Sequence, residues 1–249
     1  MKRVLWSFLV LIFLVVMAGC VEDLPISEEK PTPEVIALQL TPAVAHWLPL
    51  VATCAEGIPN FGISTQVLPR SDLSLAESDL ILRLGEQFEL DPFAALMGVE
   101  EIVIIAGADV PLETISLESL RLIYSGNYVY WGDVPQAVNE VNGIGQPIKP
   151  LSYPLGHEVE ILFRRAYLDD ELIAVDPQVF LTIPFLENLL ATYPFAIGYL
   201  LRSQVSEDMQ VIEIVSDETI VNQQFVLAVT SAEPTGGLKQ LLLCLQNAE

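Results

Sequence analysis

The stretch Leu120-Arg-Leu-Ile-Tyr-Ser-Gly-Asn-Tyr-Val-Tyr-Trp-Gly-Asp-Val134 joins a short helical pattern to an aromatic turn. Ser116 lies just before it and predicts a helix N-cap. Apolar residues then recur at the spacing of one buried helix face, at Leu117, Leu120, Ile123 and Tyr124. Gly126 predicts the end of this helix, because glycine readily adopts the left-handed conformation that follows many helices.

Strands and helices are expected to alternate on both sides of this stretch. Apolar, β-branched runs predict strands at about 35–40, 61–68, 78–84, 102–106, 148–152, 196–201, 211–215 and 225–229. Helical spacing and capping residues predict further helices at about 41–54, 157–167, 183–191 and 235–246. The alternation predicts an α/β fold with mainly parallel sheets and helices on both faces.

The first twenty residues have the pattern of an export signal. Two positive charges precede the run Val4 to Val16, which is apolar except for Ser7, and small residues lead to Cys20. The sequence Ala18-Gly19-Cys20 resembles a bacterial lipobox, which implies a signal peptide over 1–19 and a lipid on Cys20. An uncleaved anchor helix is the alternative, and both place the domain outside the cytoplasm. Residues 20–34, rich in Pro and Glu, are expected to form a flexible tether.

The formal net charge of −22 restricts the classes of partner. A strongly negative field repels polyanions, so we expect neither nucleic acid nor anionic lipid to bind the domain. A small anion remains compatible with this charge, because local backbone N–H groups and a single arginine can outweigh a distant field.

Two cysteines, Cys54 and Cys244, remain once Cys20 is assigned to lipid. They can form a disulfide in an oxidising compartment, or they can be two buried free thiols. No spacing typical of a metal site, a catalytic motif or a cofactor-binding loop is found in the chain. We therefore expect a protein that is not an enzyme and that holds no metal and no cofactor.

Two segments resemble the second lobe of type II solute-binding proteins, especially the phosphate-binding proteins of ABC transporters. One is 120–134, and the other is Pro194-Phe-Ala-Ile-Gly-Tyr199. The resemblance implies a two-lobed type II periplasmic-binding-protein fold, with lobe 1 formed by 35–107 and 209–249 and lobe 2 by 108–208. It also implies a monomer that binds a small ligand, phosphate or another oxyanion, between its lobes and presents it to an ABC permease.

The ligand motif of the family is altered in this chain. Where the phosphate binders have an Arg followed by Ser-Gly-Thr, this sequence reads Leu151-Ser-Tyr-Pro-Leu-Gly-His-Glu158. Gly156 is retained, but the arginine and the hydroxyl after the glycine are absent. Glu158 adds a negative charge to the first helical turn, and the sequence leaves open whether this side chain faces the cleft.

The candidate ligand-binding residues are Thr41, Arg83, Gly156 and His157. Thr41 offers a hydroxyl at a strand-to-helix turn, but it also fits an ordinary N-cap. Arg83 can supply a counter-charge, or it can pair with Asp79 or Glu86. The alternative function is that of a ligand-poor relative that acts as a cell-surface sensory or protein-interaction module.

Overall fold

The computed structural model describes residues 32–85, 92–110, 112–137 and 145–247. Residues from Pro33 onward form one compact unit. The expected signal peptide, Cys20 and almost all of the tether lie outside the described residues. Within the described ranges, no helix has the length and apolarity needed to cross a membrane.

Strands and helices alternate along the chain. The strands are β1 Glu34–Leu40, β2 Phe61–Val67, β3 Leu80–Leu84, β4 Phe93–Ala106, β5 Thr114–Ser116, β6 Lys149–Ser152, β7 Gln178–Val179, β8 Ala196–Leu201, β9 Gln210–Val215 and β10 Gln223–Thr230. The α-helices are α2 Leu48–Glu56, α3 Leu117–Tyr124, α4 Glu158–Tyr167, α5 Ile183–Thr192 and α6 Gly236–Gln246. Short 3₁₀ helices are η1 Pro42–Trp47, η2 Arg70–Asp72, η3 Trp131–Asp133, η4 Pro135–Ala137 and η5 Arg202–Gln204.

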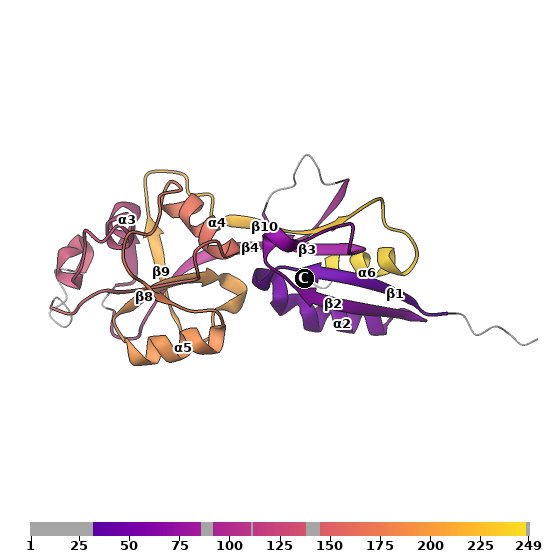
Figure 1. Cartoon of the computed structure of the whole chain (residues 1–249). Helices are drawn as coiled ribbons and strands as arrows, with labels where there is room; N and C mark the ends of the chain where they lie inside the picture. Colours follow the sequence, from indigo (N-terminus) through magenta and orange to yellow (C-terminus); the bar gives the residue numbers. More distant parts are fainter. Residues whose placement is uncertain (1–31, 86–91, 111, 138–144, 248–249) are drawn as a thin grey trace, which may run out of the picture. The chain divides into compact units, whose positions relative to one another are not determined.

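Two groups of strands share the long strand β4 (Figure 1). The first group has the order β2-β1-β3-β10 and pairs with β4 over 93–101. The second group contains β8, β6, β7, β9 and β5, and its β8 pairs with β4 over 102–106. Pairs of β1 and β6 with their neighbours are parallel, whereas β4 and β10 are antiparallel to theirs. The predicted α/β fold is confirmed, and the boundaries given for two lobes stay a prediction.

Two elements differ from the sequence-based expectation. The strand expected at 102–106 is the end of β4, which begins at Phe93. Its first half contains Ala94, Ala95 and Gly98, which have little strand propensity. Pairing with β10 stabilises the strand conformation of these residues. The helix expected over 41–54 is divided into η1 and α2, because proline is tolerated only in the first turn of a helix and Pro49 therefore requires a new start.

The helix and aromatic turn of 120–134 pack against β6 and against the residues that lead into β8. The Tyr124 hydroxyl donates to the Leu151 carbonyl at 3.2 Å, and the Trp131 indole N–H donates to the Phe195 carbonyl at 3.0 Å. Both rings are fully buried. The two segments that carry the family resemblance therefore contact each other, and these aromatic side chains belong to the core.

A disulfide joins Cys54 of α2 to Cys244 of α6, with 5.8 Å between their Cα atoms. Along the chain, α2 follows the first strand of the first group and α6 follows the last, and the two helices pack against each other. The bond therefore connects the first part of the compact unit to the last.

Candidate functional site

A buried hydroxyl follows strand β1. Thr41 is fully buried, and its backbone N–H donates to the Leu82 carbonyl of β3 at 3.1 Å. Its side chain does not cap η1. Instead, the hydroxyl donates to Oε2 of Glu158 at 2.5 Å.

A carboxylate stands at the first position of α4, on the side of the second strand group. Glu158 is only 5 % exposed, and α4 packs against β8 and also against η1 of the first group. Oε1 of Glu158 accepts a hydrogen bond from Nη1 of Arg70 at 2.7 Å. Glu158 therefore faces the groups that follow β1 and β2, which answers the question that the sequence left open.

The arginine of this pair is supported by its own loop. Nη1 of Arg70 also donates to the Leu84 carbonyl at 2.8 Å. Gly85 follows with a φ of +100°, and a Cβ built on it would lie 3.2 Å from the same nitrogen. Glycine at this position thus allows both the backbone turn and the close approach of the guanidinium. We call Thr41, Arg70 and Glu158 the interlobe cluster.

Burial dominates the electrostatics of the interlobe cluster. It raises the pKa of Glu158 above its ordinary value, although the Thr41 hydroxyl and the positive charge of Arg70 act in the opposite direction. A buried carboxylate without partners would be strongly unfavourable. The cluster is therefore the arrangement that lets this charge lie between the two strand groups.

The other predicted residues are placed differently. Arg83 is buried in β3 and donates through Nη1 to the Leu84 carbonyl at 3.3 Å. In the described part of the chain, the arginine that contacts Glu158 is Arg70. The N–H of Gly156 donates to Glu160 at 3.1 Å, so it is already used within its own helix turn.

His157 is the N-cap of α4. Its Nδ1 accepts a hydrogen bond from the Val159 N–H at 3.3 Å, and its ring stacks on Tyr153 with centroids 4.3 Å apart. Burial lowers the pKa of His157 to about 4. The imidazole is thus neutral at physiological pH, and it does not supply positive charge to an anion.

Arg70 is the cluster residue that sequence analysis missed. It begins the short 3₁₀ helix η2 after β2, within Leu68-Pro-Arg-Ser-Asp72, where no sequence motif marks it. One signal was available in the composition. The chain has 33 Asp and Glu residues but only 11 Lys and Arg residues, so each basic residue is a candidate partner for a buried carboxylate. Among the described residues, no group of three His, Cys, Asp or Glu side chains is arranged to hold a metal ion.

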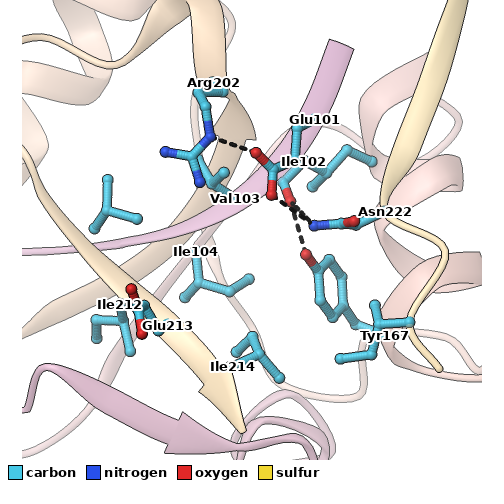
Figure 2. Close-up of a pocket in the computed structure, with 12 residues that line it drawn as sticks. Glu101, Ile102, Val103, Ile104, Tyr167, Arg202, Ile212, Glu213, Ile214 and Asn222 are labelled. Atoms are coloured by element: carbon cyan, nitrogen blue, oxygen red, sulfur yellow. Dashed lines mark hydrogen bonds and ion pairs between the residues drawn. The ribbon is translucent and has the colours of Figure 1, made fainter. Parts of the chain in front are cut away.

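A second polar cluster lines a cavity of about 360 Å³ beside the point where β4 changes partners (Figure 2). Glu101 pairs with Arg202 and accepts a hydrogen bond from Asn222 at 3.1 Å. Asn222 and the Tyr167 hydroxyl both donate to the Ile102 carbonyl, at 3.3 and 2.7 Å. This cluster fixes the backbone at the junction of the two strand groups.

Comparisons with known proteins identify similar folds. No family model matches the chain, and no curated protein matches it. An ABC-type phosphate transport receptor from Vibrio cholerae is 14 % identical with a TM-score of 0.65, over 86 % of this chain and 94 % of that one. A protein described as a phosphate ABC transporter substrate-binding protein, solved with phosphate, from Clostridium perfringens is 15 % identical with a TM-score of 0.66, over 85 % and 93 %.

A regulatory domain has a similar fold as well. The reduced OxyR regulatory domain from Pseudomonas aeruginosa is 14 % identical with a TM-score of 0.58, over 86 % of this chain and 98 % of that one. The chain therefore has the type II periplasmic-binding-protein fold that the sequence predicted. Since transport receptors and a regulatory domain share this fold, the interlobe cluster must supply the argument for function.

Proposed function

We propose that this chain is a lipid-anchored extracytoplasmic solute-binding protein that presents a small ligand to an ABC permease. The observation that supports the proposal is the convergence of Thr41 and Arg70 on the first turn of α4. A hydroxyl and a guanidinium are suitable donors to an oxyanion, and they meet a helix N-terminus that itself favours negative charge. The ligand class proposed first is accordingly phosphate or another small oxyanion, held between two lobes.

Export and anchoring rest on the N-terminal sequence and on the disulfide. The proposal assigns 1–19 to a signal peptide and a lipid to Cys20. The bond between Cys54 and Cys244 agrees with folding outside the cytoplasm, where disulfides persist. Radiolabelled fatty acid should enter the wild-type chain in a bacterial host and should be absent from Cys20→Ala. Equal labelling of both chains would contradict the anchor.

Ligand binding is tested by thermal unfolding of the detergent-solubilised full chain. Phosphate, sulfate and molybdate are added separately, because a ligand at 100 times its dissociation constant stabilises the folded state by about 2.7 kcal/mol. The wild type should be stabilised by one of these anions, and Thr41→Val should lose that effect. A cooperatively unfolding wild type that responds to none of them would contradict oxyanion binding.

A second function is favoured by one observation. The donors of Thr41 and Arg70 already hold the Glu158 carboxylate, so an anion finds them engaged. This arrangement suits a ligand-poor module that acts in sensing or protein interaction. A wild type that responds to no oxyanion, while its lipid labelling is intact, would favour this second function over transport.

A further inference from the structure

We infer that Glu158 is an internal competitor of anionic ligands: its carboxylate takes the donors of Thr41 and Arg70 and so determines which anions the interlobe site accepts. The inference rests on the site proposed above, and it adds the residue that sets the specificity of that site. It predicts that removal of one carboxylate creates or strengthens an anion site.

The contacts show that this carboxylate is held in place. Both oxygens of Glu158 are used, Oε2 by the Thr41 hydroxyl at 2.5 Å and Oε1 by Arg70 at 2.7 Å. Thr41 is fully buried and Glu158 is 5 % exposed, so water competes little for the bond between them; the Arg70 side chain is 28 % exposed. The two donors also come from different loops and converge on this one group, as they would on a bound oxyanion.

The position of Gly85 indicates that the convergence is built into the backbone. The glycine lets the Arg70 guanidinium lie against the chain, where Nη1 reaches both Leu84 and Glu158. The donor geometry thus depends on the first strand group and does not require the glutamate. We therefore expect the hydroxyl and the guanidinium to face the N-terminus of α4 when Glu158 is replaced.

A free oxyanion competes with the carboxylate for the Thr41 hydroxyl and for Nη1 of Arg70. A second negative charge close to the Glu158 carboxylate is repelled by it, and the repulsion is stronger because this carboxylate is buried. An anion that takes both of these donors must displace Glu158 from its buried position, and the lost contacts weaken the observed affinity. A smaller side chain at this position removes that competition.

The experiment measures phosphate and acetate binding by calorimetry on the detergent-solubilised full chain. Wild type is compared with Glu158→Ala and with Glu158→Gln, which removes the charge but retains most of the volume. Glu118→Ala is the matched control, because Glu118 also lies in a helix first turn but is exposed. We expect phosphate to bind Glu158→Ala at least about tenfold more tightly than wild type. A tenfold change in the dissociation constant corresponds to only a small part of the interaction between Glu158 and its two donors.

The variants separate the possible outcomes. Glu158→Gln should gain less than Glu158→Ala because it still fills the position, and Glu118→Ala should behave as wild type. Acetate should bind Glu158→Ala more tightly than wild type, because it supplies the carboxylate that the variant lacks. Adding Thr41→Val to Glu158→Ala should abolish the gain, which ties it to this site.

Two results would overturn the inference. One is equal phosphate affinity of wild type and both Glu158 variants, including the absence of binding in all of them. The other is a gain that survives Thr41→Val. The proposed transport function is tested separately. Phosphate binding by Glu158→Ala but not by wild type would contradict oxyanion transport and support the role of Glu158 as a competitor. Equal phosphate binding by both chains would support oxyanion transport and contradict that role.

Discussion

Loss of Arg70 should destabilise the chain more than loss of any surface arginine, because it leaves the Glu158 carboxylate buried with one partner fewer. The Arg70 side chain is 28 % exposed and that of Glu158 is 3 % exposed. Breaking a fully buried pair costs about 3–5 kcal/mol, and exposed pairs contribute about 0.2–1 kcal/mol. For this partly exposed arginine we expect Arg70→Met to cost roughly 2–3 kcal/mol.

A double-mutant cycle isolates the interaction from other effects of the substitution. Glu158→Gln should cost about 1 kcal/mol, since its amide oxygen still accepts the Thr41 hydroxyl. The double variant should be about 1–2 kcal/mol more stable than the sum of the single losses predicts, because Arg70→Met no longer strands a charge. Urea unfolding at pH 7 measures each free energy of unfolding.

A matched surface variant calibrates the cycle. Arg165→Met removes an arginine that is 57 % exposed and lies 4.0 Å from Asp170, so it should change stability by no more than about 0.5 kcal/mol. Additivity of the Arg70 and Glu158 losses within about 0.5 kcal/mol would refute the reasoning. It would mean that the two side chains do not interact in the folded chain.

Three further perturbations test other parts of the structure. Replacing Cys54 and Cys244 by Ala removes a cross-link between residues 190 positions apart, and urea unfolding should show a free energy of unfolding lower by about 2–5 kcal/mol. An unchanged free energy of unfolding would contradict the disulfide. Burial raises the folded pKa of Glu158, so the folded chain holds this proton more tightly than the unfolded chain. Wild type should therefore lose stability relative to Glu158→Gln as pH rises from below about 4.5 through the folded pKa, and the difference should then stay constant. A gain in stability over that pH range would contradict the direction of the shift. Tyr167→Phe removes the hydroxyl bond to Ile102 and should cost about 1 kcal/mol in the same assay, whereas a neutral result would show that this bond is not made.

The fold was predictable because its strongest signals are local. Ser116 caps α3 as expected, with its hydroxyl oxygen accepting from the Ser119 N–H at 3.1 Å, and most predicted elements lie within a few residues of those observed. The early half of β4 was not predictable, since its small residues become a strand only by pairing with β10. Likewise, the pairing of Cys54 with Cys244 depends on tertiary packing that spacing along the chain does not encode.

The candidate site was predictable only in part, for a physical reason. Thr41 and Glu158 were noticed from capping and charge, but their contact spans 117 positions and depends on how α4 packs against η1. Arg83 was predicted as the counter-charge and Arg70 was not considered, yet η2 and Gly85 bring Arg70 to the carboxylate. Periodicity identifies which face of an element is buried, but it carries no information about which distant side chain meets that face.

Fold and ligand preference therefore rest on different residues in this chain. Buried aromatic side chains such as Tyr124 and Trp131 stabilise the fold. Their hydrogen bonds go to the carbonyls of Leu151 and Phe195, which do not belong to the interlobe cluster. A change at position 158 can therefore alter what the site accepts without disturbing those contacts. Under the inference drawn above, the glutamate acts on the donors of Thr41 and Arg70, which are also suitable for an oxyanion. The inference thus predicts that this one side chain, more than the fold, decides between an oxyanion receptor and a domain that occupies its own site.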